Sequence, residues 1–125
     1  EHAPCLIKSA QKNKITSVPV ETETIMAGLS CGKPSLLGWE ILSSGADDFI
    51  TISDDLIPSV MRFLSKNSPY IEAGESSVAG LVGLIEIMKN QKVAKNIGLG
   101  SDSIVLLFGT EGATDPEIYN SIINT

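Results

Sequence analysis

The loop at residues 109–114 follows a strongly apolar run and combines glycines with short polar side chains. Gly109 and Gly112 allow a backbone or a ligand to come close, and polar atoms come from Thr110, Glu111 and Thr114. In open α/β sheets, ligands bind beyond the carboxyl ends of the strands, so this loop is the first candidate binding site. An ordinary turn between a strand and a helix, with Thr114 as the N-cap, explains the same residues equally well.

The segment GESS at residues 74–77 is the second candidate, because the carboxylate of Glu75 stands at the mouth of an apolar helix. A carboxylate in this position could hold a cofactor nitrogen, a cation or an ammonium group. Capping of the helix is the more frequent reason for Glu followed by Ser at a helix start. The residues alone leave both interpretations open.

The third candidate is the segment MAGLSCGKPS at residues 26–35, where glycines and a thiol share one loop. Cys31 could act as a nucleophile if a base lowered the pKa of its thiol. The one histidine, His2, stands at the beginning of the chain and cannot be assumed to activate it. We therefore predict no catalytic residue within this chain.

Several kinds of site are excluded by their missing patterns. The chain has no Walker-type GxxxxGK[ST], no GxGxxG after a strand, no Cys and His at metal-ligand spacing and no Ser-His-Asp set. The net charge is -6 and Arg62 is the only arginine, so no basic stripe could follow the phosphates of a nucleic acid. We predict neither a metal site nor nucleic-acid binding.

Helix signals recur along the chain. Pro4 suits the first turn of the first expected helix, and Pro116 suits position N1 of the last. Ser35 can cap a second helix, and Ser53 or Asp54 a third. The expected helices are Pro4–Lys12, Ser35–Leu42, a helix from about Ile57 to Lys66 capped by Ser53 or Asp54, a buried helix over 75–90, and one following Asp115.

Two segments have the composition of strands. Residues 48–53 alternate and are β-branched, whereas 103–109 is apolar without alternation, as in a strand covered on both faces of a parallel sheet. Residues 15–20 are expected to be extended, because Pro19 restricts them to a sheet edge or a loop. The alternation of strands and helices predicts an α/β fold, a layered domain with a short, mostly parallel sheet flanked by helices.

Length and composition indicate one domain. The chain has 125 residues, of which 42% are hydrophobic, which is sufficient for a core over residues 1–125. We interpret Cys5 and Cys31 as reduced thiols of a cytoplasmic protein, and no apolar run approaches the length of a membrane span. Because the first residue is Glu1 rather than Met, we expect a piece of a longer protein.

The chain resembles the C-terminal third of the diaminopropionate ammonia-lyase family in four stretches. These are TIMAGLSCGKPSLLGWEIL from Thr24, FITISDD from Phe49, the GESSVAGL helix from Gly74 and LLFGTEGATDPEIY from Leu106. APCLIKSA from Ala3 also fits, so the resemblance covers nearly the whole chain. TIMAGLSCG together with EGATD is fairly specific, while ESSxAG recurs in the fold type II pyridoxal-phosphate enzymes. The resemblance implies that the expected sheet belongs to the large domain of such an enzyme.

The resemblance also implies a cofactor and a reaction. Family members use pyridoxal phosphate as an electron sink for α,β-elimination from 2,3-diaminopropionate, which yields pyruvate and ammonia. Their Schiff-base lysine, phosphate-binding loop and proton-removing carboxylates correspond to positions before Glu1. None of the eight lysines here has the Schiff-base context, and Lys33 is most simply a solvated loop charge. We expect the isolated chain to be inactive and to bind no cofactor.

Four cofactor contacts carry over from the family. Thr110 is the candidate to hydrogen-bond the pyridine nitrogen, although alignment on the EGATD end places Gly109 there instead. Glu75 matches a glutamate that lies near the cofactor ring or a bound cation. Gly28 falls in a loop that faces the active-site cleft.

Two alternatives stay open. One is a fragment of another fold type II enzyme, such as a threonine dehydratase or threonine synthase, and the other is a stand-alone, non-catalytic α/β binding module. If the chain is part of a lyase, the expected partner is a small amino-acid substrate, and the parent enzyme is expected to be a homodimer. We expect neither a nucleic acid nor a membrane as a partner. Apolar surfaces that meet the missing part would also lead the isolated chain to self-associate.

Overall fold

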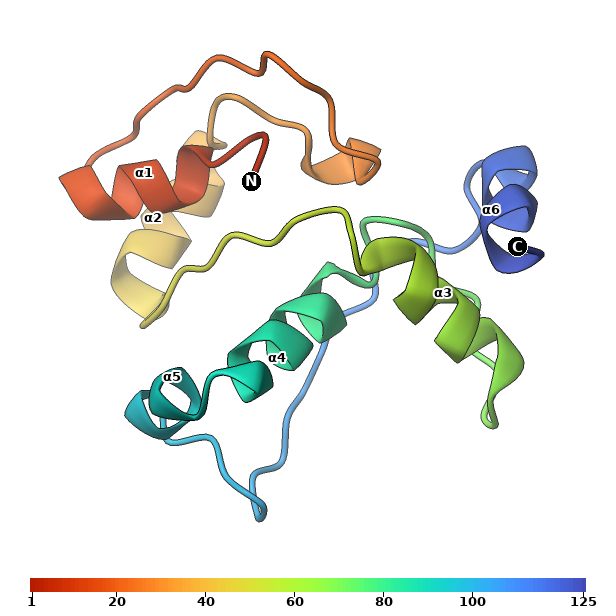
Figure 1. Cartoon of the computed structure of the whole chain (residues 1–125). Coiled ribbons are helices and arrows are strands. Elements are labelled where there is room, and N and C mark those ends of the chain that lie inside the picture. Colours follow the sequence, from red (N-terminus) through yellow and green to blue (C-terminus); the bar gives the residue numbers. More distant parts are fainter. The chain divides into compact units, whose positions relative to one another are not determined.

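The structure, a computed structural model, describes every residue from Glu1 to Thr125 and contains six α-helices and one short 3-10 helix. It divides into two compact units, unit 1 at residues 1–53 and unit 2 at residues 54–125. Figure 1 labels the helices along the chain. No helix has both the length and the apolar character that a membrane span requires.

Unit 1 contains α1 (Cys5–Lys12), η1 (Ala27–Leu29) and α2 (Leu36–Gly45), joined by long irregular segments. The helix predicted over Pro4–Lys12 is confirmed by α1. The predicted cap of α2 is confirmed too, because the Ser35 hydroxyl accepts a hydrogen bond from the Gly38 amide at 3.2 Å. This helix ends three residues beyond the predicted end at Leu42.

Hydrogen bonds from buried polar groups tie the irregular segments of unit 1 to its helices. The buried Ser9 hydroxyl on α1 donates to the Cys5 carbonyl at 2.7 Å and accepts from the Thr16 amide at 2.9 Å. The amino group of Glu1 donates to the Ile52 carbonyl at 2.7 Å, so the two ends of the unit lie together.

Unit 2 contains α3 (Ile57–Lys66), α4 (Ala79–Lys89), α5 (Gln91–Asn96) and α6 (Pro116–Ile123). The predicted late start of α3 at Ile57 is confirmed, with Leu56 rather than Ser53 or Asp54 at the N-cap position. The short α5 was not predicted as a separate helix. It begins where the Asn90 side chain accepts a hydrogen bond from the Val93 amide at 3.2 Å.

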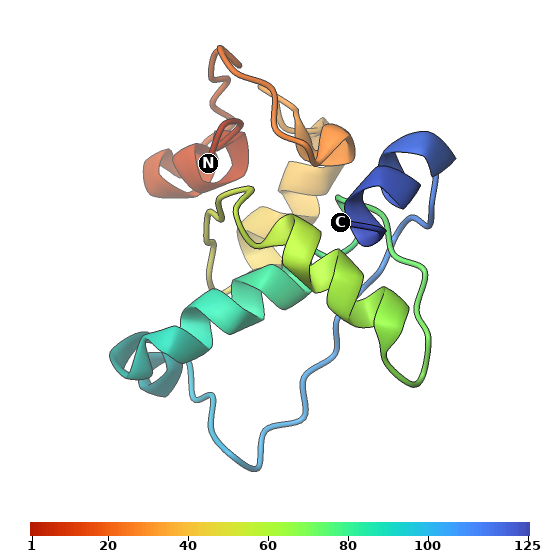
Figure 2. The same cartoon turned by 45° about the vertical axis from the view of Figure 1, so that its right-hand side comes forward.

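The core of unit 2 lies where α3 packs against α4 and α6. Its most fully buried side chains are Ile57, Met61, Val78 and Val82. Arg62 on α3 donates a hydrogen bond to the Ile122 carbonyl at 3.1 Å, which satisfies a carbonyl in the last turn of α6. Figures 1 and 2 show α3 beside α6 in both views.

The prediction of an α/β fold with a short parallel sheet is wrong, because the structure contains helices and no strand. Residues 48–53 in unit 1 and 103–109 in unit 2 have no regular secondary structure. A strand exists only when its peptide groups pair with a neighbouring strand, and neither segment has such a partner within its own unit. Apolar and β-branched composition therefore indicated the wrong element at both places.

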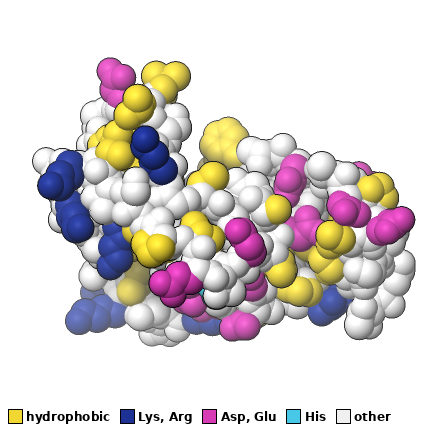
Figure 3. Space-filling model, turned by 90° about the horizontal axis from the view of Figure 1, so that it is seen from above, with side chains coloured by type: hydrophobic (Ala, Val, Ile, Leu, Met, Phe, Trp, Pro, Cys, Tyr) yellow, Lys and Arg dark blue, Asp and Glu magenta, His cyan; other side chains and the backbone are white.

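The apolar segment 103–109 is instead largely exposed, drawn as irregular coil in Figures 1 and 2. Ile104 is 100% exposed, Leu106 75% and Phe108 77%. Leu107 approaches α4, since a Cβ built on Gly80 would lie 3.5 Å from Leu107 Cδ2. Figure 3 shows one face of the molecule on which hydrophobic side chains reach the surface among acidic ones.

Candidate functional site

Two segments of unit 2 that were separate candidates in the sequence meet in the structure. We call residues 74–77 the glutamate turn and residues 109–113 the glycine loop. The Gly74 amide donates to the Glu111 carbonyl at 3.2 Å, and the Ser76 amide donates to Glu111 Oε1 at 2.7 Å. The glutamate turn, which leads into α4, is thus held directly against the glycine loop.

Glycine is required on both sides of this meeting point. A Cβ built on Gly74 would lie 2.4 Å from the Gly112 carbonyl oxygen, closer than real Cβ atoms come to backbone. A Cβ built on Gly109 would lie 2.9 Å from Ser77 Oγ. The two backbones therefore approach as closely as they do because Gly74 carries no side chain, while the bare Gly109 leaves room for the Ser77 hydroxyl.

Glu75 stands at the centre of the glutamate turn with a polar atom that lacks a partner. Its Oε1 atom is buried and makes no hydrogen bond, while the residue as a whole is half-buried. A buried polar atom without a partner costs free energy, and such atoms in native structures call for an explanation. A bound group that donates a hydrogen bond or carries positive charge would satisfy this oxygen.

Thr110 and Gly109 lie side by side at the start of the glycine loop, and both are exposed. The Thr110 hydroxyl makes no hydrogen bond within the chain, so it is available to a ligand. Of the four predicted cofactor contacts, unit 2 therefore brings three into one cluster, namely Glu75, Gly109 and Thr110.

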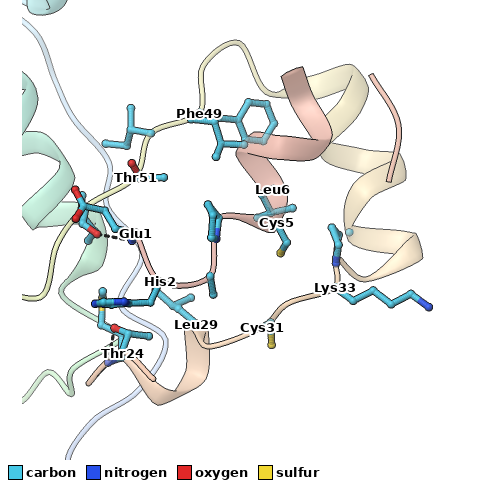
Figure 4. Close-up of a pocket in the computed structure, with 18 of the residues that line it drawn as sticks. Glu1, His2, Cys5, Leu6, Thr24, Leu29, Cys31, Lys33, Phe49 and Thr51 are labelled. Atoms are coloured by element: carbon cyan, nitrogen blue, oxygen red, sulfur yellow. Dashed lines mark hydrogen bonds between the residues drawn. The ribbon is translucent and has the colours of Figure 1, made fainter. Parts of the chain in front are cut away.

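Gly28 belongs to unit 1, where it forms part of η1 and lines a cavity of about 410 Å³. Figure 4 shows His2, Thr24 and Leu29 on one side of this cavity and Phe49 and Thr51 on the opposite side. The Lys33 side chain extends away from it, as a solvated loop charge would. The walls are mainly apolar, with Met26, Trp39 and Leu42 among them.

Both cysteines line the same cavity, and both are free thiols. Cys5 is buried and Cys31 exposed. Burial raises the pKa of the Cys5 thiol, and the nearby Cys31 raises it further. A raised pKa makes Cys5 the less reactive thiol.

Two further hydrogen bonds complete the cluster in unit 2, and nothing in the sequence indicated Glu72 as a member of it. The Glu72 carboxylate accepts a hydrogen bond from the Ala113 amide at 3.2 Å, and the Ser77 hydroxyl accepts one from the Glu111 amide at 3.5 Å. The partners are 41 and 34 residues apart in the chain, so no local sequence pattern predicts these hydrogen bonds. No group of three or more His, Cys, Asp or Glu side chains is arranged to hold a metal ion.

Known proteins similar to this chain include several diaminopropionate ammonia-lyases, although no family model matches it. The enzyme of Escherichia coli strain K12 is 37% identical over 98% of this chain and 32% of its own length. That of Salmonella typhimurium strain LT2 is 36% identical over 97% of this chain and 32% of its own length.

The same similarity is found in three dimensions. The crystal structure of the Escherichia coli enzyme in complex with an aminoacrylate-PLP azomethine reaction intermediate matches with a TM-score of 0.83 and 36% identity. It covers 97% of this chain and 32% of that enzyme's chain. The chain spans about a third of the length of the relatives that it matches, and the resemblance carried by the four stretches is confirmed: this chain is homologous to that third of diaminopropionate ammonia-lyase.

Proposed function

We propose that this chain is the C-terminal part of a pyridoxal-phosphate-dependent ammonia-lyase that converts 2,3-diaminopropionate to pyruvate and ammonia by α,β-elimination. The observation that carries the proposal is the 37% identity to such an enzyme over 98% of the chain. Because the chain corresponds to 32% of that relative's length, the activity belongs to the whole enzyme.

The cluster in unit 2 fits the ring end of pyridoxal phosphate. The buried Oε1 atom of Glu75 has no partner, and the exposed Thr110 hydroxyl is available as a donor. Gly109 lets the glycine loop come close to the Ser77 hydroxyl beside these groups, because a Cβ there would lie 2.9 Å from Ser77 Oγ. These features support Glu75, Gly109 and Thr110 as cofactor contacts.

Each of these residues has a role in the proposed site. When bound, the cofactor supplies an electron sink for charge that develops at the substrate α-carbon. The Thr110 hydroxyl would hydrogen-bond the pyridine nitrogen, and the Glu75 carboxylate would favour positive charge or a donated proton nearby. Gly28, which lies in unit 1, is proposed as a cofactor contact on the resemblance alone.

The chain supplies no covalent attachment for the cofactor. A lysine used in this way needs a lowered pKa and a nearby grip on the cofactor phosphate, and none of the eight lysines has the family's sequence context. The isolated chain is therefore a binding contributor rather than a complete catalyst.

Reconstitution tests the proposal directly. The chain alone, mixed with pyridoxal phosphate, should show no stoichiometric visible absorption band, and borohydride should trap the cofactor on no single lysine. The complete enzyme that contains this chain should form pyruvate and ammonia from 2,3-diaminopropionate only when the cofactor is present. A trapped lysine with lyase activity in the chain alone would make it a minimal enzyme, and turnover of threonine instead would favour the dehydratase alternative.

Three further properties belong to the proposal. We place the enzyme in the cytoplasm and in amino-acid catabolism, as a homodimer, and the two free thiols are compatible with a reducing compartment.

We also propose that residues 1–125 serve as one domain. A single calorimetric unfolding transition supports this, whereas two resolved transitions contradict it.

A further inference from the structure

Glu111 makes more contacts with the glutamate turn than any residue that we assigned to the cofactor. Its carbonyl accepts from the Gly74 amide at 3.2 Å, and its Oε1 atom accepts from the Ser76 amide at 2.7 Å. Its own amide donates to Ser77 Oγ at 3.5 Å. One residue of the glycine loop thus binds three of the four residues in the glutamate turn.

The side chain of Glu111 is the strongest of these links. Hydrogen bonds to an ionised acceptor are shorter and stronger than neutral ones, and the 2.7 Å contact to the Ser76 amide is the shortest of the three. The Ser76 amide lies near the start of α4, where a negative charge also interacts favourably with the helix dipole. The half-buried side chain packs on Gly74, since a Cβ there would lie 3.0 Å from both Glu111 Cγ and Oε1.

Two of the candidate cofactor contacts, Glu75 and Thr110, are direct chain neighbours of residues that make these hydrogen bonds. Glu75 lies between Gly74 and Ser76, whose amides both donate to Glu111. Thr110 immediately precedes Glu111. Loss of the Glu111 carboxylate would therefore release the Ser76 amide directly after Glu75, whereas the main-chain bond from the Gly74 amide to the Glu111 carbonyl would remain. It would also loosen Thr110 through the adjacent peptide.

We propose that Glu111 is a positioning residue for the lyase reaction, which holds the Glu75 carboxylate and the Thr110 hydroxyl at the cofactor ring. This inference rests on the proposed function and adds a residue that touches neither cofactor nor substrate. Its carboxylate acts through the Ser76 amide. Small displacements of positioning groups lower the rate strongly, because catalysis depends on the geometry of the reacting groups.

The contact itself can be tested in the complete enzyme, without reference to activity. In Glu111→Ala, the Ser76 amide should lose its charged acceptor, so its proton resonance should move upfield and its hydrogen exchange should accelerate about tenfold or more. Glu111→Gln keeps an acceptor oxygen and should change exchange less. Glu117→Ala on α6 removes an exposed carboxylate that makes no hydrogen bond and serves as the control. An unchanged Ser76 amide in Glu111→Ala would overturn the proposal.

The positioning role is tested in the complete enzyme loaded with pyridoxal phosphate. Glu111→Ala should lower kcat at least about tenfold and shift the cofactor absorption spectrum at equal cofactor content and melting temperature. Glu111→Gln should restore most of the activity, and Glu117→Ala should behave as wild type. Normal kcat and spectrum in Glu111→Ala would overturn the positioning role.

The two arms separate this inference from the proposed function. If the wild-type enzyme is inactive toward 2,3-diaminopropionate, the proposed function and the positioning role are both refuted, whatever the exchange rate of the Ser76 amide. If the wild-type enzyme is active and Glu111→Ala has the same kcat and spectrum, only the positioning role is refuted.

Discussion

The Tyr119 hydroxyl is a buried polar group whose burial should make stability depend on pH. The side chain is 4% exposed and its oxygen has no hydrogen-bond partner of normal geometry. Burial first, then the nearby Tyr70 hydroxyl and Glu72 carboxylate, raise the pKa of Tyr119 from 10.0 to about 12. The folded state therefore holds this proton more tightly, and its contribution to stability is complete below pH 10 and is lost as the pH rises to about 12.

Tyr119→Phe should remove this dependence while leaving the packing of the ring in place. At neutral pH the free energy of unfolding should stay unchanged or rise by up to about 1 kcal/mol, because a buried hydroxyl without a partner is removed. Urea unfolding between pH 8 and pH 12 measures the free energy of unfolding of both proteins. The titration of lysines affects both proteins equally and cancels in the difference between them. Parallel pH profiles for the two proteins would contradict the prediction.

The two thiols of unit 1 should differ in reactivity although they line one cavity. Cys5 is 5% exposed and its pKa is raised by burial and by Cys31, whereas Cys31 is exposed. Thiol reagents attack the thiolate at an accessible position, so Cys31 should be alkylated at least about ten times faster than Cys5. Peptide mass spectrometry over time measures both rates. In urea the rates should converge, and equal rates in the native protein would be inconsistent with the structure.

At the scale of elements, α6 depends on its N-cap. Asp115 Oδ1 accepts from the Glu117 amide at 3.0 Å and from the Ile118 amide at 3.1 Å, so Asp115 rather than Thr114 is the N-cap. Asp115→Ala should lower the free energy of unfolding by about 1 kcal/mol. Thr114→Ala is the matched control and should change it by less than about 0.5 kcal/mol. Circular dichroism during urea unfolding gives both values, and a larger loss in the control would restore Thr114 as the cap.

Helices and strands differed in how well the sequence predicted them, for a physical reason. Signals for α1, α2 and α6 are local, since a proline in the first turn or a capping serine acts within a few residues. Strand formation depends on a partner that the segment itself does not specify. The apolar segment 103–109 therefore predicted a buried strand, whereas its side chains are exposed in unit 2.

At the scale of the whole molecule, the candidate site was predicted in part. Glycines and polar residues indicated the glutamate turn and the glycine loop separately, and the structure brings the two segments into contact. Their meeting through Glu111 was not predicted, because its bond to Ser76 spans 35 residues and no periodic pattern encodes it. The assignment of Glu75, Gly109, Thr110 and Gly28 as cofactor contacts remains a prediction, and Gly28 lies in unit 1, apart from the other three.

The exposed apolar side chains of segment 103–109 should make the isolated chain self-associate. Ile104, Leu106 and Phe108 alternate along it and are at least 75% exposed, and apolar patches on extended chain are sites of association. Light scattering should therefore give a mass above the 13.2 kDa of one chain at high concentration. Leu106→Lys with Phe108→Lys should restore the monomer, because burying two charges at a contact is unfavourable. Met88→Lys on α4, at a residue that is 51% exposed, is the control, because it adds a charge elsewhere and should leave the association unchanged. A wild-type chain that stays monomeric would show that the side chains of segment 103–109 do not drive association.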